Sequence, residues 1–399
     1  MKKVIIVYDQ ALSGVQGINN VNNSFVLGQD IFKLHDLQLT HIVSPVELFE
    51  VEKHKSLKEV IGSKCESQSG KKSGLKNFVG KLCSPNLLLF SYLRMYFGYL
   101  RKAKQAVANL DKLPYTPDYI IFQDGNTAYN YFKTVKDPVK SILILHCSDD
   151  YLEQAKPVYP GYYKYKFLEN RVRAKFDYVF SKVCKVVYLS EHAVKASYLP
   201  TCLKVCIPNG IKDEPSIQVQ GPGEIIQMVS VGTVSRRKGQ LLGIQALTLL
   251  DKSVLNRIHF HVIGGGESVE ECKDYVKEHY LEKYVTIYGN RNDVSELLKK
   301  MDLFILPSYS EGMPMSILEA MRHGLFILAT ETGAIPEMIR PEFGRIITRE
   351  PENIADTITE VIESGALSLQ AKSESRLYYL DHYTTDIMVG TYAKLLTEI

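Results

Sequence analysis

The sequence predicts an α/β protein of two doubly wound domains, each with a parallel sheet covered by helices on both faces. Two observations carry this prediction. The chain has 399 residues, which is too long for one ordinary hydrophobic core. Short apolar runs rich in Val and Ile recur along it in two successive series, each run followed by a stretch with helical spacing. Continuous apolar strands that alternate with helices are typical of parallel sheets buried on both faces.

The two series of apolar runs define the expected domains. Strands of the first series are expected at residues 4–8, 119–123, 141–146, 185–189 and 204–207. Those of the second are expected at 225–232, 258–264, 284–289, 302–307 and 325–330, with helical segments following at 351–364, 368–380 and 384–398. Residues between the series are polar, with two prolines and two glycines, as in a linker. We therefore expect a first domain over 1–210, a linker over 211–224, a second domain over 225–375, and a C-terminal helix over 376–399 that could return to the first domain.

The composition excludes several classes of protein. An apolar content of 45%, a charged content of 23% and a mean hydropathy of −0.10 exclude a disordered chain and a polytopic membrane protein. The net charge of +3 is far below the excess that a nucleic-acid-binding protein carries, so no nucleic-acid partner is expected. Seven scattered cysteines fit neither a disulfide framework nor a zinc site, which favours the cytoplasm. The N-terminus predicts a first strand and not a signal peptide.

One segment differs from the rest of the chain in charge. Residues 53–104 carry twelve Lys or Arg against two Glu, interleaved with aromatic residues. This pattern is typical of segments that lie on anionic membrane surfaces, and it also fits a solvated loop followed by a buried helix. A second basic and aromatic run, 162–176, leaves the same two alternatives open.

The most informative motif is the stretch 308–324, which lies between two expected strands. It therefore follows the carboxyl end of a strand, where open α/β sheets bind ligands. Glu311, in a loop that also contains Gly312 and Met313, could accept hydrogen bonds from sugar hydroxyls. A helix is expected to begin near Ser316, and the backbone amides around Met315 and Ser316 are candidate donors to a phosphate. Glu319 lies eight residues after Glu311; alternatively, Ser316 and Glu319 form only a capping box.

A second motif, at 229–247, places three cations beside the start of a helix. A strand leads into a turn at Gly232, and Arg236, Arg237 and Lys238 follow directly before the expected helix. Cations are unfavourable at a helix N-terminus unless an anion joins them, so a phosphate group would resolve the conflict. The alternative is three solvated side chains in a loop.

The first domain offers weaker signals. Gly14, in the loop after the first strand, would allow close approach of a diphosphate. His146 ends an expected strand, where a side chain points into a ligand crevice, although a single histidine is often a satisfied polar residue. The sequence contains no D-x-D pair, zinc-binding motif, nucleophile elbow or Walker A loop. The absence of D-x-D removes one usual way of holding a metal on a diphosphate.

These motifs together resemble a known family, the retaining glycosyltransferases of family 4 in group 1. The resemblance lies in the spacing of Glu311 and Glu319 within EGMPMSILEAM, in the following HGLFILATETGAIPEMI, and in VGTVSRRKG and IPNGI. It covers residues 200–399 well and the first half only in outline. The resemblance implies the GT-B architecture of two facing Rossmann-like domains. It also implies metal-independent transfer of a sugar from a nucleoside diphosphate, with UDP favoured, to a glycan or lipid-linked acceptor in surface polysaccharide or glycoconjugate synthesis.

The resemblance also implies roles for matched residues. Lys238 would neutralise the donor diphosphate, Glu311 would contact the donor sugar and Glu319 would hold the ribose, while His146 would lie near the transferred sugar and the acceptor. The other residues expected around the donor are Gly14, Gly232, Arg236, Arg237, Gly312, Met313, Met315 and Ser316. Many family members carry Arg where this chain has Thr233. Arg236 or Arg237 could supply that charge, and the sequence does not decide between them.

Two other functions remain open at this point. The same fold serves sugar-nucleotide epimerases, and the chain could also be a non-catalytic nucleotide-sugar-binding or membrane-docking subunit. For a transferase without a covalent nucleophile, retention implies attack by the acceptor hydroxyl on the face that the diphosphate leaves. The basic segment predicts a cytoplasmic protein held peripherally at the inner face of the membrane.

Overall fold

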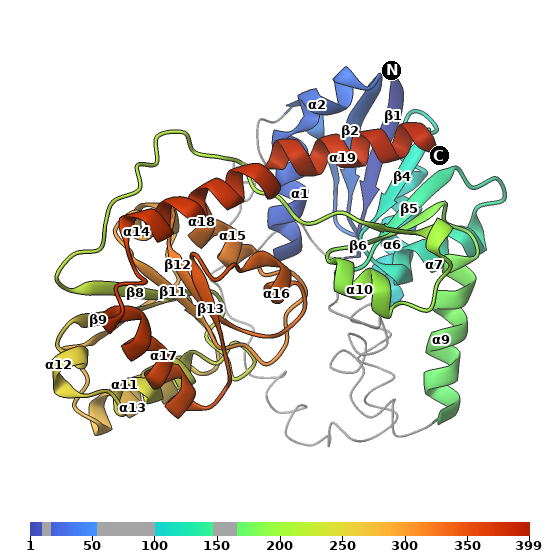
Figure 1. Cartoon of the computed structure of the whole chain (residues 1–399). Coiled ribbons are helices and arrows are strands. Elements are labelled where there is room, and N and C mark those ends of the chain that lie inside the picture. The colour runs from blue at the N-terminus through green and yellow to red at the C-terminus, as the bar shows by residue number, and fades with distance from the viewer. Residues whose placement is uncertain (10–16, 54–99, 147–165) are drawn as a thin grey trace. The chain divides into compact units, whose positions relative to one another are not determined.

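The computed structural model describes residues 1–9, 17–53, 100–146 and 166–399 (Figure 1). It divides into two compact units, of which unit 1 comprises Met1–Pro208 with Thr385–Ile399, and unit 2 comprises Asn209–Thr384. The sequence predicts a first domain ending at residue 210, a linker over 211–224 and a second domain over 225–375. The difference arises because the segment expected as a linker packs on unit 2: Ile211 forms a β-bridge with Thr384, and the Asp213 carboxylate accepts from Arg376 at 2.6 Å.

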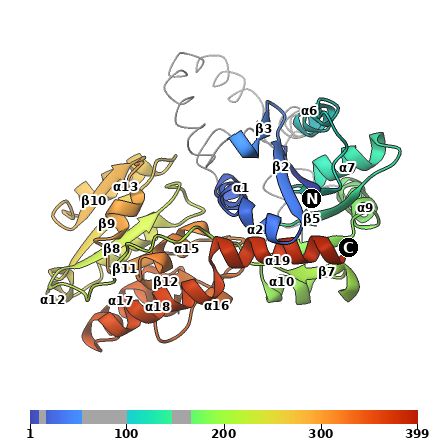
Figure 2. The same ribbon diagram turned by 90° about the horizontal axis from the view of Figure 1, so that it is seen from above.

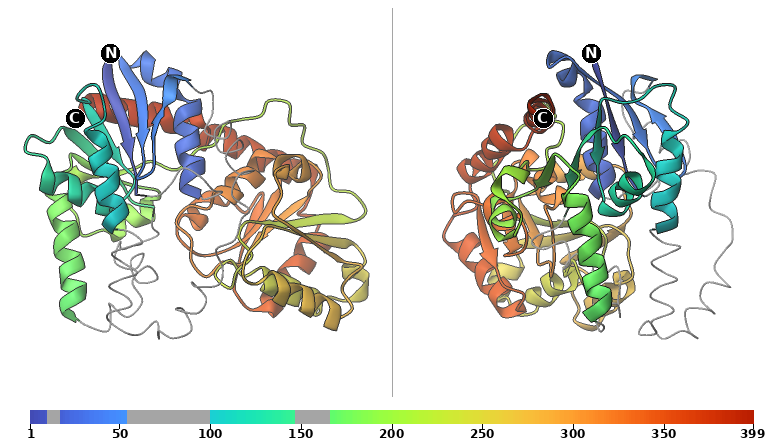
Figure 3. Two further views of the ribbon diagram at one scale, coloured as in Figure 1. Left: turned by 180° about the vertical axis from the view of Figure 1, so that it is seen from behind. Right: turned by 90° about the vertical axis from the view of Figure 1, so that its right-hand side faces the viewer.

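Unit 1 contains a seven-stranded sheet in the order β3-β2-β1-β4-β5-β6-β7, in which only the pair β2–β3 is antiparallel. Its strands are β1 (Lys2–Val7), β2 (Leu37–Val43), β3 (Leu48–Glu50), β4 (Tyr119–Phe122), β5 (Lys140–Ile144), β6 (Lys185–Tyr188) and β7 (Lys204–Cys206). Its described helices are α1 (Gly17–Leu27), α2 (Gln29–Leu34), η1 (Val51–Lys53), α6 (Arg101–Leu110), α7 (Gly125–Thr134), α9 (Lys166–Phe180), α10 (Glu191–Ala196), η4 (Thr201–Leu203) and α19 (Thr385–Glu398). Figure 3 shows α6, α7 and α9 side by side on one face of this sheet.

The C-terminal helix α19 completes unit 1. It runs along α2 and packs against α1 (Figure 2). The rings of Phe25 in α1 and Tyr392 in α19 lie 4.9 Å apart between centroids, and both side chains are fully buried. Gly28 permits this close packing, because a Cβ there would lie 2.8 Å from the Val389 side chain. The helix thus covers apolar surface that the first residues of the chain present.

Unit 2 contains a six-stranded, wholly parallel sheet in the order β10-β9-β8-β11-β12-β13. Its strands are β8 (Ile226–Val231), β9 (Ile258–Ile263), β10 (Val285–Gly289), β11 (Leu303–Leu306), β12 (Phe326–Thr330) and β13 (Gly344–Ile347). Its helices are α11 (Gln240–Leu247), α12 (Lys252–Leu255), α13 (Val269–Glu278), α14 (Val294–Leu298), α15 (Met315–Arg322), α16 (Ile335–Met338), α17 (Pro351–Glu363) and α18 (Leu369–His382). The predicted fold class, two parallel-sheet α/β units, is confirmed.

The strand order of unit 2 reverses at β8. This strand pairs with β9 on one side and with β11 on the other, so the loops that follow β8 and β11 diverge at a topological switch point. Ligands of open α/β sheets bind in the crevice at such a point, beyond the carboxyl ends of the strands. The two loops also touch, because Gly239 adopts a left-handed conformation (φ +73°) directly against the carbonyl of Pro307.

None of the described helices combines the length and the apolar character that a membrane crossing requires.

We predict that Gly239→Ala destabilises the protein more than Gly365→Ala does. Both glycines have φ +73°, so both substitutions carry the left-handed penalty of ~1–2 kcal/mol. A Cβ at Gly239 would also lie 2.2 Å from the Pro307 oxygen, whereas a Cβ at Gly365 has no atom within 4 Å. Overpacking of this kind adds ~1–3 kcal/mol. Urea denaturation followed by circular dichroism measures both variants, and equal losses would contradict the close packing of the two loops.

Candidate active site

The switch point of unit 2 brings together two residues that the sequence separates widely. Lys238 lies in the loop after β8, and Glu311 lies in the loop after β11. The Lys238 Nζ is 2.7 Å from the Glu311 Oε1, and the two side chains are 13% and 7% exposed. The structure therefore places the predicted lysine and the first predicted glutamate in direct contact, in a largely desolvated position.

The two arginines before Lys238 differ in position. Arg237 donates to the Ser310 carbonyl at 2.7 Å, and its Nη1 lies 3.5 Å from the Glu311 Oε1. Arg236 is 87% exposed and pairs with Glu271 at 3.6 Å. The choice between them that the sequence left open is thereby narrowed: Arg237 is at the lysine–glutamate pair, and Arg236 is not.

The Glu311 carboxylate is held by a neutral donor as well as by the cations. The Ser308 hydroxyl donates to Oε1 at 2.7 Å, and the Ser308 carbonyl accepts from the Thr330 hydroxyl at 2.6 Å. The contacts from Lys238, Arg237 and Ser308 therefore all reach Oε1. No hydrogen bond from a described residue reaches Oε2, which is the oxygen left for a ligand hydroxyl.

The buried side-chain amide of Gln240 holds the turn that carries Lys238. Gln240 is 1% exposed; its Oε1 accepts from the Ser235 N–H at 3.2 Å, and its Nε2 donates to the Thr233 carbonyl at 3.1 Å. Gly232 has φ +137° and lies over the lysine stem, since a Cβ there would be 4.0 Å from the Lys238 Cε. Thr233 and Gly232 thus shape the turn by their backbone.

Helix α15 begins at Met315, with Pro314 as the N-cap and no side-chain capping hydrogen bond. Ser316 is therefore the second residue of the helix, and the alternative of a capping box with Ser316 as the cap is wrong. The physical reason is that the Pro314 carbonyl accepts from the Ile317 N–H at 3.1 Å, so the helix begins two residues earlier than it would with Ser316 as its cap. The Ser316 Oγ is buried without a hydrogen-bond partner.

The other residues predicted around the donor lie on the same loop and helix. Met313 and Met315 are buried, and the Met313 sulfur accepts from the Asn209 N–H. The Gly312 carbonyl accepts from the Ala334 N–H at 2.8 Å, and Glu319 lies one turn into α15, partly buried. The first N–H groups of a helix attract anions. Two cations, a helix N-terminus and a carboxylate thus lie at one switch point, which suits an anion that carries hydroxyl groups.

In unit 1, His146 follows β5 and belongs to a buried polar chain. Its Nε2 bonds to the Gln123 Oε1, and the Gln123 Nε2 donates to the Asn22 Oδ1 at 2.9 Å. Burial lowers the pKa of His146 to about 4, so the imidazole is neutral near pH 7. Gly14 and residues 54–99 of the basic segment lie outside the described residues.

Three titratable residues that the sequence analysis missed lie in the same region of unit 1. Asp9 follows β1, Asp124 follows β4, and Lys175 on α9 donates to Asn126 beside them. Burial raises the pKa of Asp9 to about 8, with the Asp124 charge as a second cause, and burial lowers the pKa of Lys175 to about 8. For Asp9 and Asp124, the position just after an apolar strand was the available signal. The described residues contain no group of three or more His, Cys, Asp or Glu side chains that could hold a metal ion.

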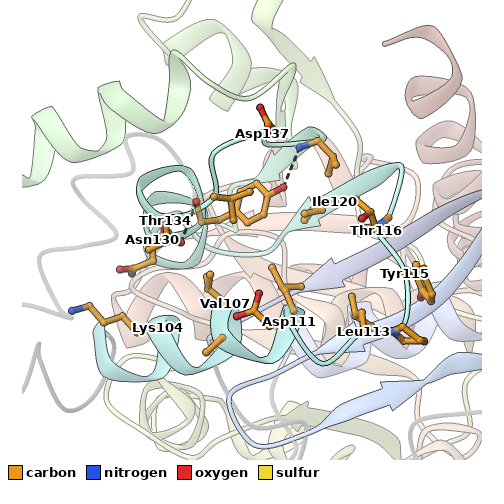
Figure 4. Close-up of a pocket in the computed structure, with 17 residues that line it drawn as sticks. Lys104, Val107, Asp111, Leu113, Tyr115, Thr116, Ile120, Asn130, Thr134 and Asp137 are labelled. Atoms are coloured by element: carbon orange, nitrogen blue, oxygen red, sulfur yellow. Dashed lines mark hydrogen bonds between the residues drawn. The ribbon is translucent and has the colours of Figure 1, made fainter.

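A cavity of about 850 Å³ lies at the amino ends of β4 and β5 in unit 1, whereas His146, Asp9 and Asp124 follow the carboxyl ends of their strands (Figure 4). Helices α6 and α7 line it with apolar side chains such as Val107, and Lys104 and Asp111 line it as well. The Tyr131 hydroxyl, also in the lining, accepts from the Val139 N–H at 3.0 Å. None of the predicted site residues lines this cavity, so it is distinct from the candidate active site.

Comparison with known proteins finds a family match in unit 2. Residues 213–378 match the family model of the glycosyl transferases group 1. The chain is 24% identical over 198 residues to the Escherichia coli UDP-Gal:alpha-D-GlcNAc-diphosphoundecaprenol alpha-1,3-galactosyltransferase, over 46% of this chain and 51% of that protein. It is 27% identical over 146 residues to the Campylobacter jejuni N,N'-diacetylbacillosaminyl-diphospho-undecaprenol alpha-1,3-N-acetylgalactosaminyltransferase, over 36% of this chain and 38% of that protein. The matches thus span about half or less of these two relatives.

Solved structures resemble the whole chain in fold. The crystal structure of Anabaena Alr3699/HepE in complex with UDP and glucose has a TM-score of 0.65 at 16% identity and covers 100% of both chains. The lipopolysaccharide outer core galactosyltransferase WaaB has the same TM-score at 17% identity, also over 100% of both chains. At this level of identity the likeness establishes the GT-B fold.

We predict that Asp9→Asn stabilises the protein more at about pH 8 than at about pH 5. The folded carboxyl has a pKa of about 8 against 3.8 for an unperturbed one, so the folded state holds the proton more tightly. That contribution to the free energy of unfolding is present at low pH and is lost as pH rises toward 8. Asparagine does not titrate, so the variant does not lose stability in this way as pH rises. Thermal unfolding of both proteins at the two pH values measures it, and a constant difference would contradict the burial of this carboxyl.

Proposed function

We propose that this chain, which matches the glycosyl transferases group 1 over residues 213–378 and has the GT-B fold, is a retaining, metal-independent enzyme of family 4. In this proposal it moves a sugar from a UDP-sugar to a glycan or lipid-linked acceptor in surface polysaccharide or glycoconjugate synthesis. The observation that carries the proposal is the convergence of Lys238, Arg237 and the N-terminus of α15 on the switch point where Glu311 lies.

Charge placement supports a diphosphate at this point. When the bond from the anomeric carbon to the diphosphate breaks, negative charge grows on the leaving oxygen. The Lys238 ammonium and the amides of Met315 and Ser316 stabilise that charge from fixed positions. Because they lie in a partly desolvated site, their effect is larger than in water. Fixed cations of this kind supply the neutralisation that a metal ion would otherwise provide.

In this proposal, the anomeric configuration is retained because the acceptor attacks the same face of the sugar that the diphosphate leaves. The acceptor oxygen bonds to the anomeric carbon on the side that the diphosphate leaves, and the acceptor proton passes to the leaving phosphate oxygen. Glu311 accepts from sugar hydroxyls and orients the ring, while Glu319 holds the ribose. His146, whose pKa is lowered by burial, is in this proposal a neutral hydrogen-bonding group for the acceptor.

The donor and acceptor classes draw support from the relatives. The E. coli relative uses UDP-Gal by its name, and the Anabaena structure contains UDP and glucose. The names of both the E. coli and C. jejuni relatives specify acceptors linked to undecaprenol through a diphosphate. We propose a lipid-linked acceptor for this chain too, and a cytoplasmic protein whose segment 53–104 contacts the anionic inner leaflet. Sedimentation with vesicles that ignored anionic lipid content and salt would contradict that contact.

We predict that UDP-sugars stabilise the protein more than GDP-, ADP- or TDP-sugars at equal concentration. A ligand that binds only the folded state raises the unfolding temperature according to its concentration relative to Kd. The panel is measured by thermal shift with and without EDTA, and the UDP-sugar shift should be the same in both. A shift abolished by EDTA would contradict metal independence, and no shift with any nucleotide would contradict the proposed donor.

We predict that Lys238→Met lowers kcat/KM on the order of 10²–10³-fold, as loss of one fixed group at the developing charge does. Arg236→Met is the matched control, since that side chain is exposed and pairs with Glu271, and its effect should stay within about twofold. The readout is UDP release from the best donor of the panel with acceptor glycans present. Proton NMR of the product reads its anomeric configuration, and an inverted product would contradict retention.

A further inference from the structure

The Glu311 carboxylate occupies the point that a donor phosphate needs. Its Oε1 lies 2.7 Å from the Lys238 ammonium and 3.5 Å from the Arg237 guanidinium. These are the two cations that converge at the switch point, and one carboxylate oxygen contacts both. A phosphate oxygen that approached the same ammonium would meet a carboxylate of the same sign in a desolvated position, where like charges repel strongly.

The same carboxylate is needed elsewhere when a donor is bound. To accept hydrogen bonds from sugar hydroxyls, Glu311 must turn its oxygens toward the sugar and away from the two cations. One contact can survive this change, because the Ser308 hydroxyl donates to Oε1 independently of the cations. Ser308 itself is fully buried and anchored to Thr330, so it stays in place as a neutral partner.

We propose that Glu311 is a competing anion at the phosphate point, and that donor binding exchanges its carboxylate on Lys238 and Arg237 for the diphosphate. This inference rests on the proposed function and adds a selection rule to it. A UDP-sugar offers the displaced carboxylate new partners in its sugar hydroxyls. Free UDP displaces the carboxylate and offers nothing in return, so the exchange favours the sugar-bearing donor over the released product.

The exchange predicts that removing the carboxylate strengthens binding of free UDP. Glu311→Gln keeps the shape of the side chain and removes its charge, which leaves both cations available to the diphosphate. We expect the Kd for UDP to fall at least about fivefold, because charge-assisted contacts to phosphate are then formed without breaking an ion pair. Isothermal titration of the full chain with UDP measures it. Turnover of the UDP-sugar should fall in the same variant, since a neutral amide oxygen accepts hydrogen bonds from the sugar hydroxyls more weakly than a carboxylate does.

Glu271→Gln is the matched control. Glu271 pairs with Arg236, the neighbouring cation of the same basic triplet, at 3.6 Å on the surface. If general charge removal strengthened UDP binding, this variant would show it too. The exchange predicts a Kd for UDP within about twofold of the wild type, as expected for an exposed ion pair.

The outcomes separate the inference from the proposed function. If the wild type binds UDP and Glu311→Gln binds it with equal or lower affinity, the exchange is overturned and the proposed function stands. If the wild type binds none of UDP, GDP, ADP and TDP, both are overturned. Circular dichroism establishes that each variant folds, and Glu311→Ala serves as a second variant with the same expected gain in UDP affinity.

Discussion

The ion pair between Lys238 and Glu311 depends on one feature of topology. Because β8 is the first strand of its sheet and pairs on both sides, the loops after β8 and β11 meet at the carboxyl edge. Burying such a pair is unfavourable unless further groups complete it, and here Arg237 and Ser308 do so. A stabilising role alone would not require two cations around one carboxylate oxygen. The excess of positive charge is what makes the place suitable for an incoming anion.

The backbone around this pair leaves little freedom. Gly333 adopts φ +56°, and its α-carbon packs against the carbonyl oxygens of Glu311 and Gly312. A Cβ at this position would lie only 2.2 Å from the Glu311 oxygen. Gly264 approaches the Gly232 carbonyl equally closely, with 1.9 Å to a notional Cβ. Glycines at these points let four loops converge on a small volume, and side chains then reach one another over short distances. Preorganisation of this kind lowers the cost of orienting charged groups when a substrate binds.

The sequence predicts the fold more completely than it predicts the contacts between side chains. Ten apolar strands could be read from their Val- and Ile-rich runs, most of which are buried, whereas β2, β3 and β13 could not. β3 and β13 are short edge strands, and β2 mixes Gln38, Thr40 and His41 with its apolar residues. The motif pointed to Glu311 and Lys238 separately, but their contact spans 73 positions and depends on strand order. Asp9 and Asp124 were missed because each stands alone in the sequence, and only the pairing of β1 with β4 brings them to one edge.

Helix α19 has a consequence for biosynthesis. Its buried Val389, Tyr392 and Leu396 belong to unit 1, although they follow the whole of unit 2 in the sequence. Chains usually complete their N-terminal domain first during synthesis. Here the apolar surface of α1 and α2 stays uncovered until residues 385–398 have been synthesised, after the whole of unit 2. Unit 2 can therefore fold on the nascent chain before unit 1 is complete, and unit 1 closes around a helix that is made later than its neighbour.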